Sequence, residues 1–200
     1  MEEKLSALYA AERARLHAAA ARGRTGEYEA PVFGEGPLHP RLMLLGEAPG
    51  AEETRLGRPF VGKAGKNLNM LLALAGYVTN AVKFRPTNVK ARSISNRPPS
   101  PAELAEGLPT LKDELRLVNP SVVATLGNTP LKALCLLGGR EPLPIGSVHG
   151  RMLKFMIDGM PLCVFPLYHP ASVIYNRSLL PLLEEDVTCL GSILNEIKEA

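Results

Sequence analysis

Residues 41–65 read RLMLLGEAPGAEETRLGRPFVGKAG, and this stretch decides the fold. The short apolar run at 42–46 is typical of a central strand in a parallel sheet, because such strands are buried on both faces. The loop after it is long and rich in glycine and proline, whereas loops that join a strand to a helix are usually short. We therefore expect this loop to surround a ligand, with Glu47 at its lip.

The composition is that of an ordinary folded protein. The chain has 200 residues, 46% of them hydrophobic and 22% charged. We expect residues 1–200 to form a single domain, with residues 1–30 supplying a helix and loop that pack on it. No apolar run reaches the roughly 18 residues of a membrane span, and the acidic, amphipathic N-terminus does not resemble a secretory signal. Three cysteines, Cys135, Cys163 and Cys189, lack a CxxC spacing and predict buried thiols in a reducing cytoplasm.

Positive charge is concentrated in one part of the sequence. The net charge is +3, yet residues 54–102 contain nine Lys and Arg residues and no Asp or Glu. That segment therefore carries +9, and the remaining 151 residues carry −6. Cations gathered in this way favour a polyanionic partner, because neutralising phosphates drives nucleic-acid binding. The alternative is a solvated basic face without a partner.

The order of the predicted elements indicates the fold class. We expect helices over residues 3–22, 68–75, 101–117, 129–137 and from 179 onward, and strands over 42–46, 77–84, 121–127 and 162–166. The last strand is the second arm of a hairpin that turns at Asp158-Gly159, whereas residues 85–100, polar and rich in proline, are expected to form a loop. Strands that alternate with helices predict a three-layer α/β/α sandwich around a mainly parallel, four-stranded sheet.

Polar residues lie at corresponding places in the four predicted strands. Glu47 follows the first strand, Asn80 lies in the second, Asn128 follows the third and His169 follows the fourth. In folds of this class, ligands bind beyond the carboxyl ends of the strands. The sequence therefore predicts that Glu47, Asn80 and His169 meet around one pocket.

The chemistry of these side chains narrows the choice of ligand. The Asn80 amide offers an acceptor and two donors, so it matches the O4 and N3–H edge of uracil, whereas cytosine would need the opposite pattern. His169 can donate to an oxygen on which negative charge develops, and Phe60 offers a flat face on which a base can stack. Each residue alone also fits a structural role, such as a hydrogen-bonded turn for His169 or core packing for Phe60. Together, beside a basic segment, they favour a nucleobase site.

Seven segments follow, in order, the pattern of the uracil-DNA glycosylases. They are VFGEGP, LMLLGEAPGAEE, GRPFVGKAG, YVTNAVKFRP, NRPPSPAEL, NPSVVATLGNTPLKAL and YHPAS. Between residues 32 and 195 the chain most resembles the family 4 branch, whose members usually carry an iron–sulfur cluster. The resemblance implies that the chain excises uracil from DNA by cleaving the N-glycosidic bond, as in base excision repair. We expect a monomer whose partner is uracil-containing DNA, single- or double-stranded.

The resemblance also implies roles for individual residues. Glu47, Asn80 and His169 become the catalytic residues: Asn80 reads the Watson–Crick edge of the base, and His169 hydrogen-bonds O2 as the uracil anion departs. Glu47 either positions the attacking water or acts through its charge, and no protein nucleophile is required. The rest of the uracil pocket is implied to consist of Gly46, Ala48, Pro59 and Phe60, with Phe60 stacked on the flipped base.

DNA contacts are implied in two segments. The loop after the histidine reads HPASVIYNRS, and it would insert Val173 and Ile174 as a wedge into the gap that the flipped base leaves, with Tyr175 as a further DNA contact. Tyr175 stands where an arginine often follows the wedge in the family. The basic segment is expected to contact phosphates through Lys63, Arg85, Lys90, Arg92 and Arg97.

The chain departs from the family 4 pattern at the cluster and at an insertion. Thiolates hold such clusters, but the sequence has no cysteine before Cys135, and Phe84 and Gly107 occupy the positions of the third and fourth cluster cysteines. We therefore predict no metal and no cofactor, with Phe84 packing against the N-terminal helix in place of the cluster. The insertion TNVKARSIS at 87–95 lacks the histidine that a covalently acting relative carries there, so we expect a DNA-contacting loop.

Three other functions remain open from the sequence. The same fold could excise another base, such as hypoxanthine, xanthine or mismatched thymine. A lesion-binding protein without catalysis would keep the basic segment, although intact Glu47, Asn80 and His169 argue against it. A nucleotide hydrolase is disfavoured, because the loop after the first strand lacks GxxxxGK[ST].

Overall fold

A five-stranded sheet forms the centre of the molecule, as seen in a computed structural model that describes residues 1–23, 26–28, 30–62, 66–91 and 93–197. The strand order is β2-β1-β5-β7-β6. Neighbouring strands from β2 to β7 are parallel, and β6 runs antiparallel to β7. The strands are β1 (Leu42–Gly46), β2 (Tyr77–Asn80), β5 (Val122–Leu126), β6 (Leu153–Ile157) and β7 (Met160–Leu167).

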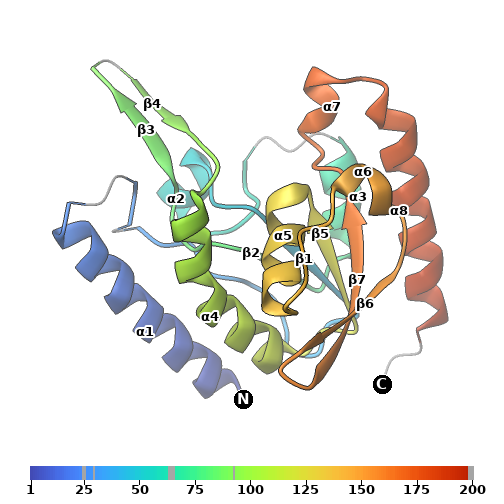
Figure 1. Ribbon diagram of the computed structural model, residues 1–200, viewed down its shortest axis with the longest axis horizontal. Helices are drawn as coiled ribbons and strands as arrows, with labels where there is room; N and C mark the ends of the chain where they lie inside the picture. Colours follow the sequence, from blue (N-terminus) through green and yellow to red (C-terminus); the bar gives the residue numbers. More distant parts are fainter. Residues whose placement is uncertain (24–25, 29, 63–65, 92, 198–200) are drawn as a thin grey trace.

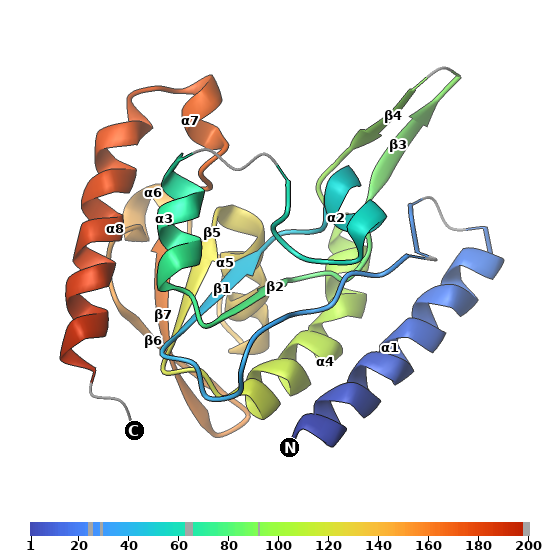
Figure 2. The same cartoon turned by 180° about the vertical axis from the view of Figure 1, so that it is seen from behind.

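Helices cover both faces of this sheet, which confirms the predicted three-layer α/β/α class (Figures 1 and 2). One face carries α4 (Pro101–Val118) and α5 (Asn128–Leu137), and the other carries α3 (Lys66–Leu74) and α8 (Leu179–Glu196). The N-terminal helix α1 (Glu2–Ala21) packs against α4. Three short helices lie in the connections: α2 (Ala51–Leu56), α6 (Ile145–Val148) and α7 (Ser172–Tyr175).

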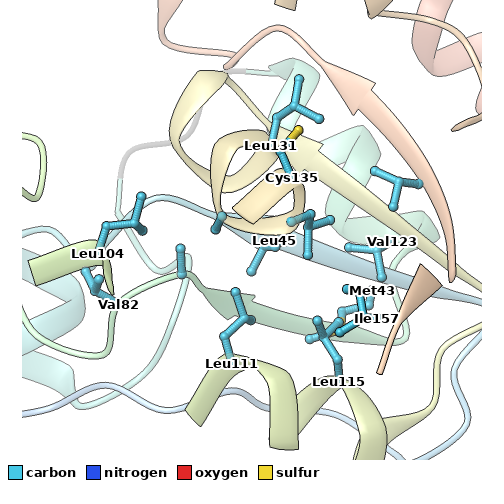
Figure 3. Close-up of a cluster of buried hydrophobic side chains, with 14 of the residues drawn as sticks. Met43, Leu45, Val82, Leu104, Leu111, Leu115, Val123, Leu131, Cys135 and Ile157 are labelled. Atoms are coloured by element: carbon cyan, nitrogen blue, oxygen red, sulfur yellow. The ribbon is translucent and has the colours of Figure 1, made fainter. Parts of the chain in front are cut away.

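The two faces of β1 show why the sequence folds in this way. Every residue of β1 is buried, and alternate side chains point to opposite faces of a strand. Met43 and Leu45 therefore join the core beneath α4 and α5, whereas Leu42 and Leu44 join the core beneath α3 and α8. Figure 3 shows the first of these clusters, with Leu111 of α4 among the side chains that meet the sheet.

The four strands predicted for the central sheet are present, and the sheet contains a fifth strand that was not predicted. The predicted hairpin turning at Asp158-Gly159 is present, but its first arm also pairs into the sheet as β6. The strand predicted over residues 77–84 ends at Asn80. Among the described residues, no helix combines the length and apolar character that crossing a bilayer requires.

The prediction of a loop over residues 85–100 was wrong. This segment contains an antiparallel hairpin of β3 (Thr87–Lys90) and β4 (Ser93–Asn96), which stands apart from the central sheet. Each arm carries a single apolar residue, Val89 or Ile94, and the two are cross-strand partners. Because so short an arm shows no alternation of apolar and polar residues, the usual strand signal is missing.

Candidate nucleobase site

The ends of β1 and β2 place a glycine beside an amide and an aromatic ring. Gly46 and Asn80 are paired in register as the last residues of the two strands. A β-carbon on Gly46 would collide with Oδ1 of Asn80 and lie 2.8 Å from Cζ of Phe60. The absence of a side chain at Gly46 therefore lets the Asn80 amide and the Phe60 ring pack directly against the end of β1.

The Phe60 ring is held by an unusual backbone. Phe60 has a φ of 56°, in the left-handed region that bulky residues rarely adopt. Pro59 before it is buried, and Phe60 itself is half-buried against the core beneath α3 and α8. Backbone conformations of this kind cost free energy and tend to occur at functional sites. The backbone conformation of Phe60 therefore costs stability, and it places the ring against Gly46.

The Asn80 side chain is buried but makes no hydrogen bond within the described part of the chain. Asn80 is only 5% exposed. Its backbone carbonyl accepts a 2.8 Å hydrogen bond from Nζ of Lys83. The amide is not among the fully buried side-chain atoms that lack a partner, so it is open to a ligand that completes its hydrogen bonds.

Lys83 belongs to a buried network that fixes the end of β2. Lys83 and Glu114 are 1% and 0% exposed and form an ion pair of 2.5 Å, and Lys83 also donates to Oγ1 of Thr79 at 2.6 Å. Removing one partner of such a pair leaves an uncompensated buried charge. The network therefore holds the β2 end, with Asn80, in one position. The sequence did not reveal this role, because Lys83 reads there as one more cation of the basic segment.

His169 is held as a neutral imidazole. Its Nδ1 accepts a 3.1 Å hydrogen bond from the backbone N–H of Ala171, and an accepting ring nitrogen carries no proton, so the proton is on Nε2. Burial lowers the pKa of His169, and the charge of Glu47 opposes this shift only in part. Gly127, after β5, packs closely on this residue, since a β-carbon there would lie 3.2 Å from Cβ of His169. The site therefore presents a neutral N–H donor.

Glu47 is anchored by a residue that the sequence analysis missed. Oγ1 of Thr129, in the first turn of α5, donates a hydrogen bond to Oε2 of Glu47. The predicted pocket residue Ala48 is half-buried and packs against the core beneath α4 and α5. Asn128 does not join the site in this way, because its Oδ1 accepts from the backbone N–H of Ile145. The sequence feature that could have identified Thr129 is its hydroxyl group, which comes directly after Asn128 at the end of the third predicted strand.

The short helix α7 contains both predicted wedge residues, Val173 and Ile174, and the predicted DNA contact Tyr175. Ile174 and Tyr175 are 77% and 89% exposed, whereas Val173 packs against the core. Figures 1 and 2 show α7 on the side of the sheet toward which β7 points. Ile174 and Tyr175 are thus free to contact a ligand outside the molecule, and Val173 holds their helix to the body.

Two of the cations predicted to contact phosphates are instead paired within the protein. Arg85 is 9% exposed and pairs with Glu27 at 2.8 Å. Arg97 pairs with Glu103 at 2.6 Å. Lys90 is exposed on β3. Two further predicted phosphate contacts, Lys63 and Arg92, lie outside the described residues.

The two positions that the resemblance assigns to cluster cysteines hold Phe84 and Gly107, and neither residue offers a thiolate. Phe84 is 3% exposed and stacks on Tyr28 with 3.9 Å between ring centroids, in the same core as residues of α1. Gly107 lies so close to the neighbouring chain that a β-carbon would be 3.0 Å from the carbonyl oxygen of Ala81. Cys135 is buried within the apolar core (Figure 3). Within the described ranges, no three His, Cys, Asp or Glu side chains are grouped to bind a metal.

Comparison with known proteins identifies the family. Residues 33–192 match the model of the uracil DNA glycosylase superfamily. A type-4 uracil-DNA glycosylase from Saccharolobus solfataricus is 37% identical over 162 residues, covering 78% of this chain and 72% of the relative. One from Thermotoga maritima is 37% identical over 173 residues, covering 82% and 83%. A type-5 uracil-DNA glycosylase from Mycobacterium tuberculosis is 29% identical over 174 residues, covering 78% and 64%.

The chain therefore belongs to the uracil DNA glycosylase superfamily. It is a hydrolytic DNA glycosylase, an enzyme of DNA repair whose partner is DNA. The resemblance to the family 4 branch that the sequence motifs carry is confirmed by these relatives.

Proposed function

We propose that this enzyme excises uracil from DNA, leaves an abasic site and works without an iron–sulfur cluster. The observation that supports the proposal is the amide of Asn80, which has no hydrogen-bond partner in the described part of the chain and packs with the Phe60 ring against Gly46. A uracil stacked on the ring would present O4 and N3–H to this amide, and both would find a partner. Cytosine presents the opposite pattern and would leave the amide mismatched.

The reaction is a hydrolysis of the bond between N1 of uracil and C1′ of the deoxyribose. The bonding electrons leave with the base, so negative charge develops on uracil and positive charge on the sugar. The Nε2–H of neutral His169 donates to O2 of the departing anion, where fixed donors are most effective. Water then adds to C1′, and the proton that it loses is taken up by the uracil anion through solvent, so that the products are neutral uracil and the abasic sugar. Glu47, anchored by Thr129, positions this water or stabilises the cationic sugar.

The base must leave the duplex before it can reach this pocket. The exposed Ile174 and Tyr175 of α7 are suited to fill the gap in the base stack, with Val173 behind them. Lys90 is exposed and, with Lys63 and Arg92, is proposed to contact phosphates. Arg85 and Arg97 are paired within the protein, so they are proposed to support DNA binding indirectly, by holding the β3–β4 segment in place. We further propose that residues 1–200 act as one monomeric unit.

The test is a panel of labelled oligonucleotides, each with one uracil, hypoxanthine or xanthine, or with thymine opposite guanine. Each is incubated with the enzyme in EDTA, single-stranded and as a duplex, and alkali then converts abasic sites into strand breaks. We expect breaks at uracil only, in both forms of DNA. Faster release of another base would reassign the substrate, and tight binding without breaks would indicate a lesion-binding protein.

A further inference from the structure

The β3–β4 hairpin projects from the body beside the proposed site. Figures 1 and 2 show it on the same side of the molecule as α7, with the rest of the fold below both. Apart from Thr87, every described residue of the two strands is exposed. The hairpin thus contributes little to the core, and two-stranded ribbons are only marginally stable alone. A role outside the fold would explain why it is present.

Two arginines fix the direction of this hairpin. Nε of Arg85 donates to Oδ1 of Asn96 at 2.7 Å, and its Nη1 donates to Glu27 at 2.8 Å. Arg97 donates to both carboxylate oxygens of Glu103, at 2.6 and 2.7 Å. Paired guanidinium contacts of this kind are directional as well as strong. The base of the hairpin is therefore tied to the N-terminal segment on one side and to α4 on the other.

The stem of the hairpin presents apolar and cationic groups to solvent. Val89 and Ile94 are directly opposite each other and are 67% and 56% exposed. Neither belongs to the core clusters. Lys90 is exposed next to them, and no acidic residue occurs anywhere in residues 54–102. The ribbon thus combines an apolar pair with positive charge and has nothing that would repel phosphate.

We propose that the β3–β4 hairpin is a second DNA-contacting element, which lies in a groove of duplex DNA away from the flipped base. The major groove admits a two-stranded β-ribbon, and apolar side chains there contact thymine methyl groups, while cations contact the phosphates. The rigid base keeps the ribbon ready for binding, which lowers the entropic cost of association. This inference rests on the proposed function, since the DNA held between the hairpin and α7 is the uracil-containing substrate.

The hairpin acts on only one form of DNA. A single strand has no groove, so it can occupy the pocket at Asn80 without using the ribbon. A duplex uses both the site and the hairpin. Changes at Val89 and Ile94 therefore weaken duplex binding selectively, whereas changes in the pocket affect both forms.

The experiment uses a V89S/I94S variant of the full chain. Affinity is measured by fluorescence anisotropy on an undamaged duplex and on the matching single strand, and kcat/KM is measured on U:G duplex and on single-stranded uracil DNA. We expect about a tenfold loss in duplex affinity and duplex kcat/KM, the size of one lost groove contact, with single-strand values unchanged. Met156→Ser is the matched control, because Met156 is a 55% exposed apolar residue on β6 of the other hairpin.

A Lys90→Ala variant provides a second readout. If Lys90 contacts a phosphate of the duplex, the slope of log K against log salt becomes shallower by about 0.9 for duplex DNA, while the slope for single strands stays as in the wild type. Both substitutions are at exposed positions, and an unchanged melting temperature would show that the fold is intact.

Several results would overturn the proposal. Equal losses on duplex and single strand would mean that the hairpin has no groove contact, and so would unchanged duplex affinity. A change in sedimentation coefficient on V89S/I94S substitution would mean that the hairpin is an interface between copies. Failure of the wild type to excise uracil would instead refute the proposed function, so the two failures are distinguishable.

Discussion

Gly46 shows how one residue can set the positions of two candidate site side chains. Any side chain at this position would occupy the space between Oδ1 of Asn80 and the Phe60 ring. The strand could carry alanine here without backbone strain, because Gly46 is not among the residues with positive φ. The requirement for glycine therefore arises from the close approach of the Asn80 and Phe60 side chains and not from the backbone.

Gly46→Ala should consequently reduce uracil excision without unfolding the enzyme. We expect kcat/KM to fall about 10- to 100-fold, because overfilling a close-packed site costs about 1–3 kcal/mol. Gly191→Ala is the control, since a β-carbon at Gly191 in α8 meets nothing within 4 Å. Wild-type kinetics in Gly46→Ala would mean that the base binds elsewhere.

The protonation state of His169 predicts a pH profile. Burial lowers the pKa of His169 and the charge of Glu47 offsets part of that shift, so the imidazole stays neutral down to pH values below its usual pKa of about 6.5. The competent form is neutral, because Nδ1 must accept from Ala171. Single-turnover excision should be flat from alkaline pH to about 6.5 and fall only below it. A fall that already begins above pH 7 would contradict a neutral donor with a lowered pKa.

The sequence predicted those residues of the candidate site that lie at the ends of strands. Glu47, Asn80 and His169 follow the rule that ligands bind at the carboxyl edge of the sheet, and the structure puts them at strand ends. Their supports were not predictable. Thr129, in the helix α5 that follows β5, hydrogen-bonds Glu47, which follows β1. Lys83 contacts Glu114, which lies 31 positions later in the sequence. Contacts of this kind depend on tertiary packing, which periodicity does not encode.

At the scale of elements, the start of α4 connects the hairpin to the body. Ser100 and Glu103 form a capping box, with the Glu103 backbone N–H donating to Oγ of Ser100 and Glu103 accepting from the Ser100 backbone N–H at 2.7 Å. Glu103 also accepts from Arg97 and from the hydroxyl of Tyr28. One carboxylate therefore joins the helix cap, the hairpin base and the N-terminal segment.

This carboxylate should make stability depend on pH. Burial alone would raise the pKa of Glu103, but the hydrogen bonds from Arg97, Ser100 and Tyr28 outweigh it and lower the pKa from 4.5 to about 2. Because the folded-state pKa is depressed, the stabilisation is complete above pH 4.5 and disappears as the pH falls to about 2.

Urea unfolding of the wild type and of Glu103→Gln between pH 2 and pH 6 tests this. The free energy of unfolding of the wild type should decline across the acid window, and the difference between the two proteins should shrink as the pH falls. A difference that is constant with pH would show that the Glu103 charge does not stabilise the fold.

The elements themselves were predictable in the core and not at the edges. Apolar runs predicted β1, β5 and β7 because their burial is continuous, and the βα alternation predicted their order. The hairpin was missed because β3 and β4 bury almost nothing, and their stability comes from Arg85 and Arg97 at the base. Hydrophobic periodicity reports burial, so an exposed ribbon gives no such signal.

At the scale of the whole molecule, we propose that apolar packing takes the place of the family 4 cluster. The stack of Phe84 on Tyr28 links the segment after β2 to the N-terminal segment, and Leu16 of α1 lies in the same core. The burial of these aromatic side chains therefore helps to hold the N-terminal region against the rest of the protein. Residues before the family match at 33–192 thus pack on the matched part of the chain.

Two measurements test the proposal that apolar packing replaces the cluster. One is metal analysis of the purified enzyme, and the other is substitution of Phe84. We expect the purified enzyme to contain no iron and to keep its melting temperature and uracil excision after EDTA treatment. Phe84→Ala should cost about 3–5 kcal/mol of stability, as for other buried phenylalanines. Iron bound in stoichiometric amounts, or a Phe84→Ala protein as stable as the wild type, would contradict this.

The central claim is that Asn80 and His169 hold and release uracil. The most direct measurement is single-turnover release of free uracil, identified by mass spectrometry together with the abasic strand, for the wild type, Asn80→Ala and His169→Ala. We predict equal amounts of free uracil and abasic strand from the wild type, and rates lower by about 100-fold or more in both variants, as when a fixed donor to the developing charge is removed. No free uracil from the wild type, or undiminished release by either variant, would contradict the account.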